Sequence, residues 1–217
     1  MFMAQCFRFG WRRCSPLNWA LCELGVSMIE ALIGLSGVII GVLATGLKDW
    51  ITFQMTSRQR KQYLATRVVS MLEIFVDNCA QVVKDDGTYR GLPDKDGYYL
   101  PQVVTPKFEP LSLEVDWLSI NSELMHQILY LPNEIYVANS KIESVWDYVA
   151  EPPDYAELFE ERHYQYSLLA IKATKLIQSL YNEAKLKEYK GKWEWFEPDL
   201  FESVVKKVEL NRDQKFT

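Results

Sequence analysis

The chain has 217 residues, a formal net charge of −5 and a hydrophobic content of 48%. This is enough material for a membrane anchor plus one soluble domain of about 165 residues, a size that buries a self-sufficient core. The acidic balance is spread over the chain and gives no reason to expect nucleic acid as a partner.

Residues 1–27 form an N-terminal tail without a periodic pattern that indicates a helix or a strand. Three of the four cysteines, Cys6, Cys14 and Cys22, lie in this tail and show no metal-ligand spacing. Together with Cys79 they indicate reduced thiols in a cytosolic setting. Met28 offers an alternative translation start, from which the tail would not be translated.

The most informative segment is an uncharged apolar run over residues 31–47. As a helix this run extends about 25 Å, close to the thickness of a bilayer core. Met28 and Trp50 extend it at its two ends, so we expect one transmembrane helix over residues 28–50. Within it, Gly37, Gly41 and Thr45 form a small-residue face that permits close packing of two such helices and hence self-association.

A cleaved signal peptide is the alternative reading of the same region. Arg12 and Arg13 would supply its basic segment, and the small residues 44–46 lie near a cleavage point. The helical pattern nevertheless continues through that point without a break, which favours the anchor.

Basic residues follow the apolar run over residues 31–47, whereas the fifteen residues before that run contain no Lys or Arg. By the positive-inside rule, residues 51–217 then face the cytoplasm, and we expect a single-pass protein of a bacterial inner membrane. The residues expected at the membrane interface on this side are Trp50, Arg58, Arg60 and Lys61. Trp193 and Trp195, which lie among lysines, are candidates for a second interfacial contact.

After Trp50, apolar residues fall three and four apart as far as Val82, which predicts a helix that continues the membrane span. Asp85, Asp86 and Gly87 supply its stop, because glycine adopts the left-handed conformation that ends helices. Residues 86–118 then contain four prolines and short alternating stretches, which predict an ordered Pro-rich excursion with a small hairpin at most.

Two helices are predicted after the excursion, separated by a proline. We expect a short helix over residues 122–131, capped by Asn121 or Ser122, a break at Pro132, and a second helix over residues 133–149.

The longest soluble helix is predicted from Tyr155 to about Tyr189, after a Pro-Pro joint, with Gly191 as its end. Pro198 then opens a last helix that extends at least to Val208. The fold class is therefore all-α: a transmembrane helix that continues into an antiparallel helical bundle or coiled-coil hairpin.

Several stretches resemble a group of uncharacterised bacterial proteins with one N-terminal span. The likeness extends from residue 28 to about residue 205 and is carried by residues 116–120, 128–133, 152–155, 159–162 and 164–166. The resemblance implies this layout and a bacterial origin, and it transfers no activity and no functional residue.

The sharpest chemical hypothesis concerns the two histidines, each of which has a glutamate three residues before it. Glu123 with His126, and Glu160 with His163, would each share one helix face. In a four-helix bundle, two such pairs and two further carboxylates bind a di-iron or di-manganese centre. The alternative is that Glu160 and His163 lie on a solvated face beside Glu161 and Arg162.

Glu73 and Asp77 lie one helical turn apart in an apolar helix and are candidates for the further carboxylates. The simpler reading is that both face water. No phosphate-binding loop, nucleophile elbow or Cys and His constellation occurs.

The sequence favours a non-enzymatic interaction or scaffold module, with the lipid bilayer and a protein partner or a second copy as its contacts, and with no cofactor. The alternatives are a carboxylate-bridged di-metal enzyme and a membrane-acting toxin or defence effector.

Overall fold

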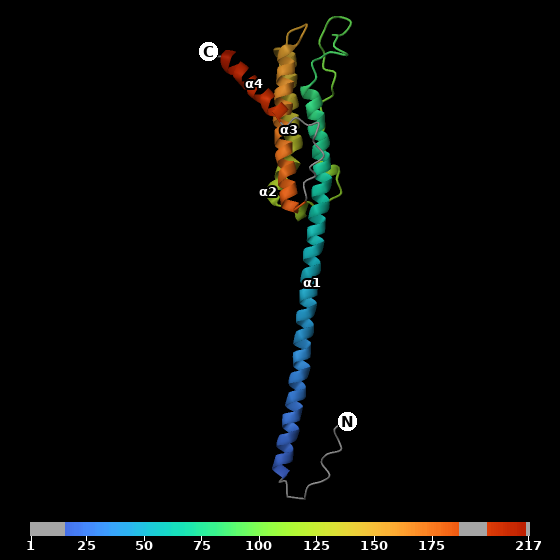
Figure 1. Ribbon diagram of the computed structural model, residues 1–217, viewed down its shortest axis with the longest axis vertical. Coiled ribbons are helices and arrows are strands. Elements are labelled where there is room, and N and C mark those ends of the chain that lie inside the picture. Colours follow the sequence, from blue (N-terminus) through green and yellow to red (C-terminus); the bar gives the residue numbers. More distant parts are fainter. Residues whose placement is uncertain (1–15, 187–198, 216–217) are drawn as a thin grey trace. The chain divides into compact units, whose positions relative to one another are not determined.

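The computed structural model describes residues 16–186 and 199–215, with side chains for residues 41–186 and 199–214. The chain divides into two compact units, Met1–Met55 and Thr56–Thr217. The described residues form helices and no strand, so the predicted all-α class is confirmed (Figure 1).

Helix α1 (Pro16–Val83) is continuous over 68 residues. It therefore begins within residues 1–27, for which the sequence predicts no regular structure. As predicted, the helix after Trp50 continues from the expected span without a break. In the first unit, every described side chain from residue 41 to residue 55 is exposed. Within the described side chains, no helical stretch is both long and apolar enough to cross a membrane. Residues 28–40 of the expected span lie outside that set.

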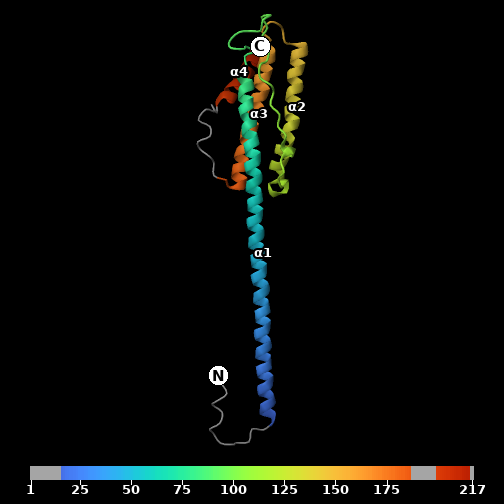
Figure 2. The same cartoon turned by 90° about the vertical axis from the view of Figure 1, so that its right-hand side faces the viewer.

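In the second unit, the C-terminal part of α1 packs with α2 (Ser122–Tyr148) and α3 (Ala156–Ala184), and α2 and α3 run in opposite directions (Figures 1 and 2). Their apolar faces form one core, whose largest fully buried side chains include Leu72, Phe75, Ile128, Leu131, Tyr166 and Leu180. The predicted helical bundle is therefore confirmed.

The end of α1 is built as the sequence predicts. Gly87 has φ +75°, and its backbone N–H donates to Oδ1 of Asp85 at 3.1 Å. A Cβ at this position would lie 2.5 Å from Cζ of Phe159. Both the left-handed backbone and the close approach of a buried ring therefore require glycine here.

Residues 84–121 connect α1 to α2 and include two 3₁₀ turns, η1 (Pro110–Ser112) and η2 (Trp117–Ser119). Only one isolated bridge, between Tyr89 and Leu92, occurs among the described residues, so no hairpin forms. Burial alternates instead over residues 106–110, between the two stretches (98–104 and 111–115) in which the sequence alternates: Pro106, Phe108 and Pro110 are buried and the residues between them are exposed. The segment is extended and packs one of its sides on the bundle, where the ring centres of Phe108 and Phe75 are 5.9 Å apart.

The predicted break at Pro132 is wrong: α2 is a single helix of 27 residues with this proline inside it. The expected cap is correct, since the Asn121 side chain accepts a hydrogen bond from the Glu123 N–H at 2.8 Å. Proline removes one backbone hydrogen bond from a helix. Ile128, Leu131 and Ile135 are buried on either side of it, and this packing keeps the helix continuous.

Helix α3 begins after Tyr155, whose φ is +47°, and ends at Ala184 rather than near Tyr189, because Lys185 adopts a left-handed conformation with φ +51°. Gly191, the predicted end, lies outside the described residues. The last helix, α4 (Asp199–Lys215), packs on α3 and buries Phe201 and Val208, as predicted.

Candidate functional site

The two Glu and His pairs lie far from each other in the bundle. Glu123 and His126 are at the start of α2, whereas Glu160 and His163 are near the start of α3, and the antiparallel arrangement places these starts at opposite ends (Figure 2). No group of three or more His, Cys, Asp or Glu side chains that could hold a metal occurs within the described part of the chain. The structure does not bring the four predicted ligands together.

Each pair instead makes local contacts. Glu123 accepts a hydrogen bond from Gln127 at 2.8 Å, and the His126 ring stacks on Tyr130 with centroids 5.6 Å apart. Glu160 lies 3.8 Å from Nε of Arg212 on α4.

The face of α3 that carries the second pair is not solvated. Glu161 and Arg162 are 9% and 6% exposed, so the reading of this face as solvated is wrong. Glu161 binds Arg212 at 2.5 Å and Gln165 at 2.7 Å, and the Arg212 guanidinium lies 4.5 Å from the Tyr164 ring centre. These contacts attach α4 to α3.

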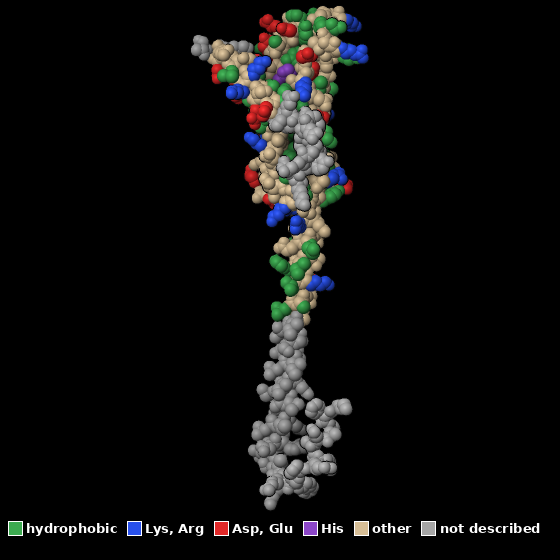
Figure 3. Space-filling model, in the orientation of Figure 1, with side chains coloured by type: hydrophobic (Ala, Val, Ile, Leu, Met, Phe, Trp, Pro, Cys, Tyr) green, Lys and Arg blue, Asp and Glu red, His purple; other side chains and the backbone are tan. Residues whose placement is uncertain are grey.

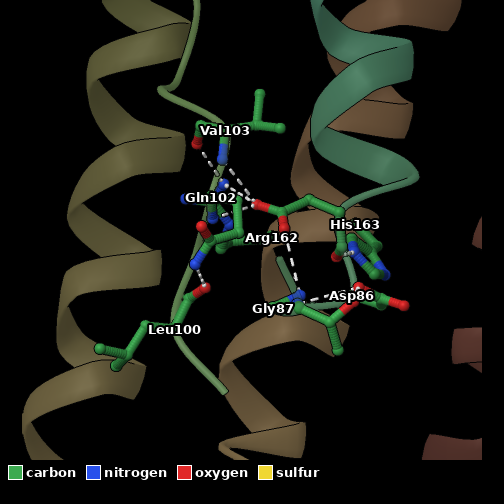
Figure 4. Close-up of polar contacts among 9 residues, drawn as sticks. Asp86, Gly87, Leu100, Gln102, Val103, Arg162 and His163 are labelled. Atoms are coloured by element: carbon green, nitrogen blue, oxygen red, sulfur yellow. Dashed lines mark hydrogen bonds and ion pairs between the residues drawn. The ribbon is translucent and has the colours of Figure 1, made fainter. Parts of the chain in front are cut away.

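A buried polar cluster lies where the end of α1, the connecting segment and α3 meet (Figure 4). Oδ2 of Asp85 accepts hydrogen bonds from the backbone N–H groups of Gln102 and Val103, each at 3.0 Å. Nη2 of Arg162 lies 3.4 Å from the same oxygen and donates to the Val103 carbonyl at 2.9 Å. We call Asp85 and Arg162 the polar clamp, because together they hold Val103 of the extended segment through its backbone N–H and C=O groups.

The polar clamp is almost completely removed from water, since its side chains are 2% and 7% exposed. Burial lowers the pKa of Arg162, and the Asp85 charge opposes this change. The Nε atom of Arg162 is buried and has no hydrogen-bond partner among the described residues. The clamp therefore depends on its single ion pair and on the backbone groups that it holds.

His163 lies next to the clamp and connects α3 to the end of α1. Its Nε2 is 2.9 Å from the Asp85 carbonyl oxygen, which can only accept, so Nε2 carries the proton. Burial lowers the pKa of His163. The hydrogen bond to the Asp85 backbone and the Asp85 charge oppose this change, and the Arg162 and Lys207 charges add to it. The imidazole is thus held neutral as a structural donor.

The two carboxylates of α1 have different surroundings. Glu73 is 5% exposed, so the interpretation that it faces water is wrong. Asp77 is half-buried and accepts a hydrogen bond from Gln81 at 3.3 Å.

The basic residues expected at the membrane interface are partly used inside the bundle. Arg60 pairs with Asp116 at 3.5 Å, and Lys61 pairs with Glu183 at 2.6 Å. Trp50 is 60% exposed and Arg58 is exposed. Trp193 and Trp195 lie outside the described residues.

The small-residue face of the expected span is described only in part. A Cβ at Gly41 would meet no atom within 4 Å, and Thr45 Oγ1 donates to the Gly41 carbonyl at 2.9 Å. The side chain of Thr45 therefore needs no partner from another helix, and Gly41 leaves space for one. Gly37 lies outside the described side chains.

A shallow groove of about 470 Å³ lies between α2 and α3. Tyr130, Val137 and Leu168 line it, together with Glu134 and Lys172, which form an ion pair across it. The groove contains no cluster of catalytic groups among its lining residues.

The polar clamp was not predicted from the sequence, because Asp85 was interpreted as a turn residue and Arg162 as part of a charged helical face. The one available signal was helical spacing: Arg162 lies four residues after Leu158 and seven before Leu169, so it shares the face of α3 that these leucines bury.

Fold and clamp together define a helical bundle with an extended segment fixed on its surface. Comparison with protein-family models, with curated proteins and with solved structures finds no match to this chain.

Proposed function

We propose that the protein is a membrane-anchored helical interaction or scaffold module of a bacterial inner membrane. One transmembrane helix over residues 28–50 holds it, and residues 51–217 lie in the cytoplasm. The bundle and residues 86–118 are presented to a protein partner.

The observation that carries this proposal is the exposure of large apolar side chains along the first unit. Between 44% and 71% of each side chain is exposed for Val42, Leu43, Leu47, Trp50, Ile51, Phe53 and Met55. Full burial of one such side chain stabilises by about 1.5–3 kcal/mol relative to exposure in water. A helix with this surface therefore gains several kcal/mol on entering lipid, and the uncharged run over residues 31–47 continues the same apolar character.

The test is membrane association of the full chain and of a double variant, Val42→Lys with Leu43→Lys. Each lysine at the centre of a span costs about 2.5–3.5 kcal/mol on insertion, so we expect the variant to leave the membrane fraction on alkaline carbonate extraction. Tyr136→Lys, at a 73% exposed site on α2, is the matched control and should stay in the membrane.

Orientation is tested with two C-terminal reporters on the full chain. A fluorescent protein should fluoresce and alkaline phosphatase should be inactive, because only the former matures in the cytoplasm. Extraction of the unmodified chain by carbonate, or retention of the double-lysine variant, would refute the anchor, and active phosphatase would refute the orientation.

A further inference from the structure

One end of the bundle carries a group of aromatic side chains, several of which are exposed. The Trp146 ring stacks on Tyr155 with centroids 4.9 Å apart, and Tyr98 lies 6.3 Å from the same tyrosine. Trp146 and Tyr98 are 42% and 40% exposed, and Tyr148, at the end of α2, is 87% exposed. Tryptophan and tyrosine are the residues most enriched at the centres of protein interfaces.

This arrangement is held in place by the backbone. The Tyr99 N–H donates to the Pro153 carbonyl at 2.9 Å, which joins the connecting segment to the link between α2 and α3. Tyr155 adopts the left-handed region with φ +47°, and its N–H bonds to the Glu151 carbonyl at 3.0 Å. The aromatic rings therefore belong to a preorganised surface rather than to a loop that must order on binding.

The side of these rings formed by α2, α3 and their link is acidic, whereas the segment that holds Tyr98 also carries Arg90 and Lys95. Residues 142–161 contain seven acidic residues and no Lys or Arg. Glu143, Asp147, Glu151 and Asp154 are exposed, and none of them pairs with a Lys or Arg among the described residues. Figure 3 shows acidic and hydrophobic side chains at this end of the bundle, with Lys or Arg side chains beside them. We call these eight residues the acidic aromatic surface: Tyr98, Trp146, Tyr148, Tyr155, Glu143, Asp147, Glu151 and Asp154.

We infer that the acidic aromatic surface binds an arginine- or lysine-bearing segment of a partner protein. A guanidinium over an indole or phenol ring gains cation–π energy, and carboxylates at the rim pair with the same cation. The same charges repel nucleic acid and anionic lipid, which leaves a cationic polypeptide as the complementary occupant. This inference rests on the proposed role as an interaction module and names the chemistry of its partner.

The test uses the full chain in detergent micelles, with short fluorescent peptides of alternating arginine and serine, lysine and serine, or glutamate and serine. We expect saturable binding of the two cationic peptides, tighter for arginine because its planar group stacks on aromatic rings. The glutamate peptide should not bind. Fluorescence anisotropy measures each affinity.

Trp146→Ala should weaken arginine-peptide binding about fivefold to tenfold, and Asp147→Lys with Glu151→Lys at least about tenfold. Tyr148→Ala should also weaken binding. Because Tyr148 is 87% exposed and contributes little to the fold, this variant still tests the inference if the Trp146→Ala protein does not fold. Glu202→Lys on α4 and Tyr136→Ala on α2 are the controls and should change affinity less than about twofold.

Absence of saturable binding by both cationic peptides, binding of the glutamate peptide, or equal weakening by Glu202→Lys would overturn the inference. Because the assay is done in detergent, its failure leaves membrane anchorage untouched. Failure of the extraction test likewise leaves the peptide result standing.

Discussion

The polar clamp gives the most direct test of the physical reasoning, through the substitution Asp85→Asn. The native carboxylate accepts hydrogen bonds from the backbone N–H groups of Gly87, Gln102 and Val103, and it is the ion-pair partner of Arg162. Asparagine has almost the same shape but only one acceptor oxygen and no charge. One side of its amide must therefore present N–H groups to backbone N–H groups, and Arg162 becomes an unpaired buried charge.

Breaking a buried ion pair by removing one partner costs about 3–5 kcal/mol. Arg162→Met should cost less, about 1–3 kcal/mol, because Asp85 keeps its three backbone donors. Arg60→Ala removes a pair in which the arginine is 63% exposed, and it should cost under about 1 kcal/mol. The predicted order of destabilisation is therefore Asp85→Asn, Arg162→Met and Arg60→Ala.

The assay is urea unfolding of the full chain in detergent, followed by far-ultraviolet circular dichroism, together with amide hydrogen exchange. Asp85→Asn should also speed exchange at Gln102 and Val103 more than at amides in the centre of α3, because these two N–H groups lose their acceptor. A stability within about 1 kcal/mol of the unmodified chain, or destabilisation by Arg60→Ala equal to that by Asp85→Asn, would refute the clamp.

Three further predictions follow from other contacts. Because burial lowers the pKa of His163 below its ordinary value near 6.5, its contribution to stability is complete above that pH and is lost as the pH falls towards the folded pKa. His163→Gln should flatten the fall in unfolding midpoint between about pH 7.5 and 5.5, and an unchanged slope would contradict this. Asn121→Ala should destabilise by about 1 kcal/mol in the same urea assay, through loss of the α2 cap, and no change would show that the cap is dispensable. Gly41→Leu should lower self-association of the span in a membrane two-hybrid assay, whereas Gly46→Leu, on the side of the helix away from Gly37 and Gly41, should not; equal signals for all three chains would exclude helix pairing through Gly41.

The helices were predictable because each buries apolar side chains along one face, and residues on one helix face lie three and four apart in the sequence. Leu64, Val68, Leu72 and Phe75 show this spacing and are buried in α1. The break at Pro132 was predicted from local preference, which tertiary packing overrides. The Pro-rich segment was predicted to be irregular or to form a small hairpin, and the sequence could not decide between these, because alternation reports one buried side and says nothing about what pairs with the backbone.

The candidate site was less predictable, since its members come from distant parts of the chain. Asp85 and Arg162 are 77 residues apart, and nothing in the local sequence of either residue reports the other. Glu and His at a spacing of three were visible in the sequence, but their separation in space depends on the direction of α2 relative to α3. Spacing within one helix constrains a shared face and leaves the partner helix undetermined.

The buried position of Cys79 allows the opening of the helical bundle to be measured through the reactivity of this one thiol. Its thiol is fully buried in the core, and burial raises its pKa well above the ordinary value, so the reactive thiolate is suppressed in the folded bundle. A thiol reagent can modify Cys79 only when α1 separates from its neighbours, and mass spectrometry distinguishes this site from the three cysteines of the N-terminal tail. The labelling rate of Cys79 in intact cells would then measure how often the bundle opens in its natural surroundings.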